Sequence, residues 1–232
     1  MPAPCFTDET LKFLRALRRN NDREWFLARK SDYEQHVRGP MVEVIGQLAH
    51  DLAWFAPDLV AHPKVSMYRV YRDTRFSTDK TPLKTHVAAV FPHRALTKHG
   101  GAGLYFAVHP EHVFVGGGIY RPESRQLYSI REHVAANVGR MRAIVESPVF
   151  RRSFGEVSGA RLQRVPRGFA KDHPAAEYLK LKQFLAGREH PPSFATGPRF
   201  YSSLLRSFEQ LAPFIRFLNK PLAAETNRAL HQ

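Results

Sequence analysis

Basic side chains are concentrated between residues 69 and 86. They stand among hydroxyl and aromatic residues and are Arg69, Arg72, Arg75, Lys80 and Lys84. Arginine offers a planar fork of N–H donors and lysine a mobile ammonium group, so both suit an oxyanion. Between residues 64 and 86 six basic residues face two acidic ones, so four positive charges find no partner within the segment. This surplus predicts an anion site, and a phosphate-bearing small molecule is the leading hypothesis.

Hydroxyl groups and a glycine run are predicted to complete this site. The glycines at 116–118 are expected to end a strand and precede a helix, where backbone N–H groups can face an anion. The alternative is that the glycines only allow close packing, and that Arg and Asp pair locally to order a loop. The predicted anion-binding set is Arg69, Arg72, Arg75, Ser77, Lys80, Thr81, Lys84, Gly116, Gly117, Gly118 and Arg121.

A catalytic function is a second hypothesis for the same segment. Asp73, Asp79 and His86 lie beside the cations, as metal-assisted hydrolysis or transfer on a phosphorylated substrate would require. Carboxylates paired with arginine have lowered pKa values, which makes them poor bases near neutrality but acceptable metal ligands. No complete metal-ligand motif is present, no cofactor is identified, and the sequence does not decide whether the protein is an enzyme.

The net charge suggests a third function, nucleic-acid binding. The formal charge is +14, and residues 121–232 carry 19 basic and nine acidic groups, a net +10. Such a balance favours contact with polyanions. The arginines in this half are scattered, however, and no helix-turn-helix, zinc-finger or RNA-recognition signature appears. Nucleic acid therefore stands as an alternative partner to the small anion.

Length and composition predict one globular domain spanning residues 1–232, with an ordered core from about residue 6 to residue 218. Hydrophobic residues make up 43% of the chain, which is ordinary for a globular protein. The one cysteine, Cys5, excludes an internal disulfide. No apolar stretch approaches the roughly 20 residues of a membrane-spanning helix, and no signal peptide is recognised. We therefore expect a cytoplasmic protein; its oligomeric state is not predicted.

The hydrophobic pattern predicts an α+β fold with a small, mostly antiparallel sheet of about four strands between N-terminal and C-terminal helices. Helices are expected from Thr7 to Asn20, from Asn21 (with Glu24 as a capping box), and over 41–52, 127–145, 148–154, 174–182 and 201–218, with an interruption at Gly39-Pro40. Strands are expected over 65–72, 87–91, 104–108 and 113–115, the last two forming a hairpin.

Four motifs resemble a family of unknown activity. They are the run from Asn20 to Phe26, the long run from Tyr71 to Thr85, the run from Gly116 to Pro122, and the run from Phe169 to Lys180. Together they are similar to domain of unknown function 2461 over nearly the whole chain. Thr78 and Leu83 depart from the Lys and Tyr common there. The resemblance implies one full-length domain and brings no known activity, cofactor or catalytic residue.

Overall fold

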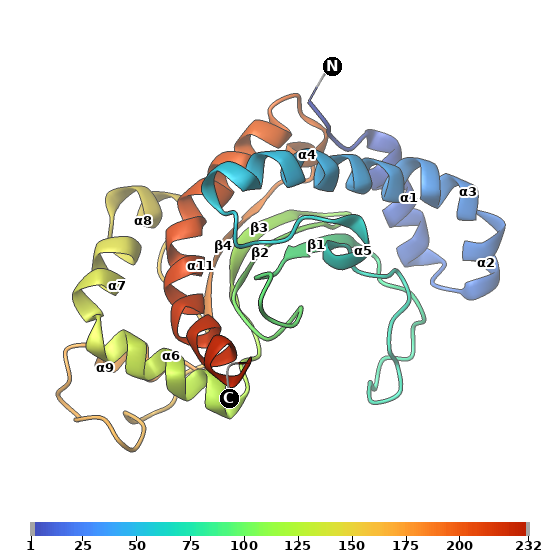
Figure 1. The fold of residues 1–232 in the computed structure, drawn as a ribbon. Coiled ribbons are helices and arrows are strands. Elements are labelled where there is room, and N and C mark those ends of the chain that lie inside the picture. Colours follow the sequence, from blue (N-terminus) through green and yellow to red (C-terminus); the bar gives the residue numbers. More distant parts are fainter. Residues whose placement is uncertain (1–2, 231–232) are drawn as a thin grey trace.

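A four-stranded antiparallel sheet forms the centre of the protein. The computed structural model describes residues 3–230, with side chains up to residue 226; residues 1–2 and 231–232 of the predicted domain lie outside this range. The strands are β1 (Val87–Phe91), β2 (Gly103–Val108), β3 (Val113–Ile119) and β4 (Phe184–His190), in the order β1-β2-β3-β4. Helices precede and follow the sheet (Figure 1). The predicted α+β class is confirmed, whereas the single-domain assignment stays a prediction.

The helices before the sheet largely follow the predicted pattern. They are α1 (Asp8–Arg19), α2 (Arg23–Ala28), α3 (Lys30–Tyr33), the π-helix η1 (Glu34–Arg38), α4 (Gly39–Phe55) and α5 (Pro63–Ser66). The capping box predicted at Asn21 is wrong, because Asp22 accepts the backbone N–H groups of Glu24 and Trp25. The predicted interruption at Gly39 is also absent. A π turn there leads straight into α4, where Pro40 sits in the first turn and needs no N–H partner.

The helices after β3 differ more from the prediction. They are α6 (Ser124–Ala136), α7 (Val138–Val145), α8 (Pro148–Phe154), α9 (Ala176–Leu179), α10 (Ser193–Thr196) and α11 (Phe200–Leu230). The helix predicted over 127–145 breaks at Asn137, which has a non-helical backbone between α6 and α7. The last helix continues through Pro213 and Pro221 to Leu230, beyond its predicted end at residue 218.

The fourth strand is not the one that the sequence predicted. Residues 65–72 make only isolated bridges, such as Met67 to Ala89 and Tyr71 to Leu83, and begin inside α5. Instead β4 pairs with β3 along its length, from Val113 opposite His190 to Ile119 opposite Phe184. Residues 69–85, here called the arm, project from the edge of the sheet beside β1 (Figure 1).

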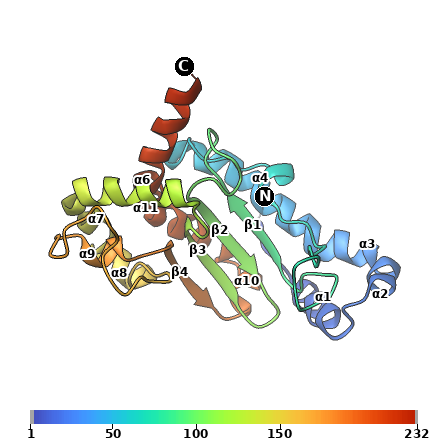
Figure 2. The ribbon, with the colours of Figure 1, turned by 90° about the horizontal axis from the view of Figure 1, so that it is seen from below.

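The two faces of the sheet have different neighbours. Successive side chains of a strand point to opposite faces. On one face the ring of Phe106 lies among those of Phe6, Phe200 and Phe208, and this core packs against α11 and α4. On the other face, which Figure 2 views from below, no helix of residues 3–230 crosses the middle of the strands. We call this second surface the open face.

Candidate functional site

The open face carries a row of half-buried aromatic rings. Tyr105 of β2 lies edge-on to Tyr68, with ring centroids 6.3 Å apart, and 6.0 Å from the ring of Phe114 on β3. Phe114 extends over glycine positions: a Cβ added to Gly116 or Gly187 would lie 2.8 or 2.5 Å from its ring atoms. The absence of side chains at these glycines therefore lets the ring lie flat against the sheet.

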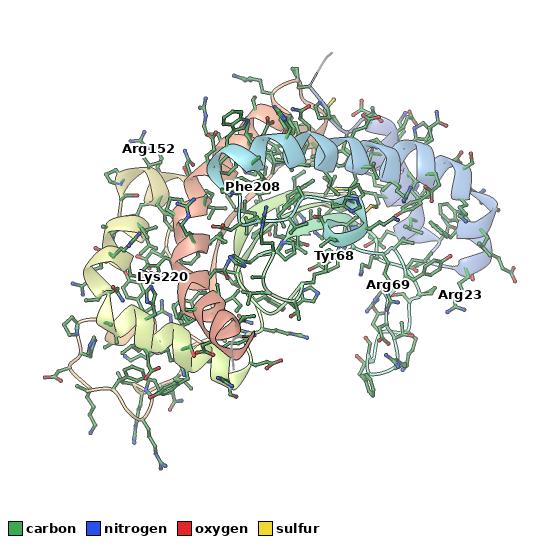
Figure 3. The ribbon with its side chains drawn as sticks, viewed as in Figure 1. Arg23, Tyr68, Arg69, Arg152, Phe208 and Lys220 are labelled. Carbon is green, nitrogen blue, oxygen red and sulfur yellow. The ribbon has the colours of Figure 1, made fainter. Side chains whose placement is uncertain are left out.

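Two lysines flank Tyr68. The Nζ atoms of Lys84 and Lys98 lie 5.2 and 4.5 Å from the centroid of its ring. Lys84 donates to the carbonyl oxygen of Arg69 at 2.8 Å, and Lys98 donates to that of Met67 at 3.2 Å. The two ammonium groups thus donate hydrogen bonds to the backbone carbonyls of the residues before and after Tyr68. Figure 3 labels Tyr68 and Arg69 where the arm leaves the sheet.

His99 completes this group by stacking on Tyr68, with ring centroids 5.9 Å apart and planes 18° apart. We define the lysine–tyrosine cluster as Tyr68, Lys84, Lys98, His99 and Tyr105. Each ammonium group has three N–H donors and one of them is bonded to a carbonyl, so two on each lysine are left. Neither lysine makes an ion pair with a carboxylate in the part of the chain that the structure describes. The cluster therefore offers four N–H donors and two uncompensated charges.

Two asparagine side chains hold the backbone next to these lysines. Asn21 donates its amide to the carbonyl of Leu83 at 2.9 Å and accepts the N–H of Leu83 at 3.0 Å. Asn219 of α11 makes the same double contact with Ala102, at 2.9 and 2.8 Å. Leu83 immediately precedes Lys84, and Ala102 ends the loop that carries Lys98. The positions of both lysines thus depend on contacts with distant segments, namely the loop between α1 and α2 and the helix α11.

The electrostatics of the cluster reflect burial and like charge. Burial, and then the charges of Arg69, Lys98 and Arg72, lower the pKa of Lys84. Burial lowers the pKa of Lys98 as well. Burial and the neighbouring Tyr68 raise the pKa of Tyr105 to about 12, so its hydroxyl stays a neutral donor. An anion bound at the two lysines would offset the cost of burying both ammonium groups and the repulsion that Lys84 experiences from neighbouring cations.

Arg72 is paired within the arm. Its guanidinium donates to Asp79 and Thr81, with Ser77 3.5 Å away. Asp79 also accepts the backbone N–H of Thr81 at 2.9 Å. The hydrogen bond from Arg72, and then those from Thr81, lower the pKa of Asp79 to about 2. These residues of the predicted set therefore order the arm among themselves.

The tip of the arm is paired in the same way. Arg75 contacts both oxygens of Asp73, at 3.0 and 2.7 Å. The hydrogen bonds from Arg75 lower the pKa of Asp73 to about 2. Lys80 donates to the carbonyl of Thr74 at 3.0 Å. Asp73 and Asp79 are thus ionised partners of arginine, which makes them poor candidates for a base near neutrality.

The glycine run does not lie where the sequence predicted. Gly116, Gly117 and Gly118 lie inside β3 and pair with β2 and β4 instead of ending the strand. The reason is close approach: a Cβ on Gly117 would lie 2.8 Å from a β2 carbonyl oxygen, and Gly118 has a φ of +131°. Arg121 follows the strand, exposed over the ring of Tyr120. Gly118 pairs with Gly103, the first residue of β2. The arm leads into Val87, which pairs with Val108 at the other end of β2. Gly118 is thus at the end of the strand remote from the arm, whereas Gly116 pairs with Tyr105 in the middle of β2.

A comparison with known protein families identifies the family of this chain. The family described as Conserved hypothetical protein (DUF2461) matches residues 9–217. The chain belongs to this family. The match contains both the arm and the lysine–tyrosine cluster of this DUF2461 protein, and it confirms the resemblance of the sequence motifs. No curated protein matches the chain.

Most residues of the lysine–tyrosine cluster of this DUF2461 protein are not in the predicted anion-binding set. Within the cluster, Lys84 belongs to the predicted set, whereas Tyr68, Lys98, His99 and Tyr105 do not. Two signals were available. Tyr105 alternates with apolar Leu104 and Phe106, so it had to face away from the core, and Lys98-His99 stands in a loop rich in basic residues and glycine. Their proximity to Lys84 depends on strand pairing, which neither signal contains.

Three histidines stack at the edge of the open face. The ring centroids of His86 and His109 are 4.4 Å apart, and those of His109 and His112 4.2 Å apart. Burial, followed by neighbouring positive groups, lowers the pKa values of His86 and His109 to about 4. Both rings are therefore neutral near pH 7 and add no charge to the site. Among the described residues, no group of three or more His, Cys, Asp or Glu could hold a metal ion.

No helix among residues 3–230 is long and apolar enough to cross a membrane.

Proposed function

We propose that this DUF2461 protein binds a phosphate-bearing small molecule on the open face of its sheet. The phosphate would be bound by the ammonium groups of Lys84 and Lys98, beside the ring of Tyr68. A reducing, cytoplasmic location is part of the proposal and follows from the single cysteine, Cys5. Enzymatic activity is not part of it.

One observation carries the proposal: two half-buried lysines flank one tyrosine and have carbonyl partners but no carboxylate among the described residues. Buried charges are normally paired. The arm offers an instructive contrast, because Arg72 and Arg75 each have an aspartate of their own. Local pairing thus accounts for Arg72 and Arg75, whereas Lys84 and Lys98 are half-buried cations without a carboxylate partner among the described residues, and we infer that they call for an external anion.

The surroundings of the two lysines favour a small ligand with a planar or apolar body. Tyr105 and Phe114 continue the aromatic row away from the lysines along the sheet. Aromatic side chains in such positions bind planar rings by stacking or edge contacts. The two lysines lie together within one cluster, which suits one phosphate group better than the regularly spaced phosphates of a nucleic acid.

The proposal is tested by thermal denaturation and calorimetry with pyrophosphate, adenosine monophosphate, and a twelve-nucleotide single strand. A ligand at one hundred times its dissociation constant stabilises the folded protein by about 2.7 kcal/mol. For a chain of this length that corresponds to a rise in melting temperature of roughly 5–11 °C. We expect this rise with one of the two small phosphates and its loss in Lys98→Ala.

The matched control is Lys171→Ala, which removes an exposed lysine outside the cluster and should keep the full rise. The proposal fails if neither small phosphate binds, or if Lys98→Ala binds as tightly as the wild type. Binding of the oligonucleotide alone, weakened steeply by salt, would favour the nucleic-acid alternative.

A further inference from the structure

A cavity of about 650 Å³ lies against α11, and no residue of the lysine–tyrosine cluster lines it. Its walls come from α7, from α11, and from the loops that follow α4 and β1. The floor consists of buried apolar side chains, among them Leu59, Ala212, Ile215 and Phe217. This volume lies within the range of roughly 300–1,000 Å³ that is typical of small-molecule sites.

The rim of this cavity is basic. Arg140, Arg216 and Lys220 line it and are exposed to solvent. Arg216 donates to the carbonyl of Phe55 at 2.9 Å. None of the three makes an ion pair within residues 3–226. Figure 3 labels Lys220 on the side of α11 that faces α7.

The charge balance of the rim indicates the kind of ligand. Asp58 is the one carboxylate among the lining residues, so three cations and one anion leave a net charge of +2 (3 − 1). An apolar floor beneath a basic rim matches a molecule with an apolar body and an anionic head. The carboxylate of Asp58 on the same rim favours a singly charged head over a doubly charged phosphate, because it would repel the second charge.

We infer that this cavity binds a small amphipathic carboxylate, with its hydrocarbon chain on the apolar floor and its carboxylate at Arg140 and Lys220. This site does not depend on the function proposed above, since the two share no residue.

Isothermal titration of the full-length protein with octanoate, 1-octanol and octyl phosphate tests the inference. The three probes share one hydrocarbon chain and differ in the head. We expect octanoate to bind about ten-fold more tightly than octanol, because a charge-assisted hydrogen bond contributes that much. Lys220→Ala should weaken octanoate about ten-fold and leave octanol unchanged, while Lys98→Ala should leave both affinities unchanged.

A second pair of variants tests where the chain lies. Ala223→Trp places a large ring on the cavity wall and should abolish binding of both octanoate and octanol, whereas Ala136→Trp, on the exposed side of α6, should not. Ile144→Trp serves the same purpose if Ala223→Trp does not fold, as judged from its melting curve. Three results would overturn the inference: no binding of octanoate at millimolar concentration, unchanged binding in the filled variant, or equal losses of octanoate and octanol in Lys220→Ala. Tighter binding of octyl phosphate than of octanoate would overturn the assignment of a carboxylate.

Discussion

Asn219 offers a direct test of how α11 positions the loop that carries Lys98. Its side chain is 2% exposed and pairs with both backbone groups of Ala102, which is fully buried. In Asn219→Ala the N–H and the C=O of Ala102 both lose their partner and remain inside the protein. The substitution therefore leaves two buried polar groups unsatisfied without any change on the surface.

The expected cost follows from this count. Each buried backbone group without a partner costs about 1–3 kcal/mol. A water molecule entering the space vacated by the amide would satisfy part of this demand. We therefore expect the free energy of unfolding to fall by about 3 kcal/mol, within the range of two unsatisfied groups. For a chain of this length the melting temperature should fall by roughly 6–12 °C.

Urea denaturation at 25 °C, with Asn21→Ala and Asn219→Leu as comparisons, provides the measurement. Asn21 makes the same pair of contacts with Leu83 but is only half-buried, so Asn21→Ala should cost less, about 1 kcal/mol. Asn219→Leu fills the space but restores neither hydrogen bond, so it should be as unstable as Asn219→Ala. Near-wild-type stability of Asn219→Leu, or a loss below about 1 kcal/mol in Asn219→Ala, would refute the role given to the two hydrogen bonds.

Three further predictions concern the sheet, the histidine stack and the arm. Gly118→Ala should lower the free energy of unfolding by about 3 kcal/mol or more, because its φ is +131° and a Cβ would overlap a β4 carbonyl oxygen. The control is Gly46→Ala, where a Cβ meets nothing within 4 Å; it should raise the free energy of unfolding by about 0.5–1 kcal/mol. Both variants are measured by urea titration, and equal changes in their free energies of unfolding would contradict the packing argument. The pKa of His86 falls from 6.5 to about 4 on folding, so its contribution to stability is present above pH 6.5 and is lost as the pH falls toward 4. Between pH 6.5 and 4, the free energy of unfolding of His86→Gln should therefore fall by about 1–2 kcal/mol less than that of the wild type, a value reduced for partial exposure. Parallel stability–pH curves of the two proteins would show that His86 is not responsible. Arg75→Ala should leave the unliganded melting temperature unchanged, because its partner Asp73 can be hydrated in an exposed pair; a clear fall would make that pair a structural element.

Local patterns determined much of the fold. The spacing of Leu11, Leu14 and Leu17 and the acidic first turn mark α1, and the alternation of Leu104 and Phe106 with polar neighbours marks β2. These signals succeed because amphipathic periodicity reports which side of an element is buried. They failed where a contact distant in sequence decides the conformation. Residues 65–72 have a strand-forming composition but no continuous partner, whereas β4 forms because β3 lies beside it.

The candidate site divides in the same way. The sequence alone shows the excess of positive charge around Lys84, because the number of basic and acidic residues in a segment does not change on folding. The sequence could not determine which cations remain uncompensated. Arg72 and Arg75 meet aspartates a few residues away, whereas Lys84 and Lys98 both reach the ring of Tyr68 only after the arm and the loop before β2 come together. The tertiary structure decides which charged side chains come close together. It does so because strand pairing and the hydrogen bonds of Asn21 and Asn219 fix the distances between segments that are far apart in the sequence.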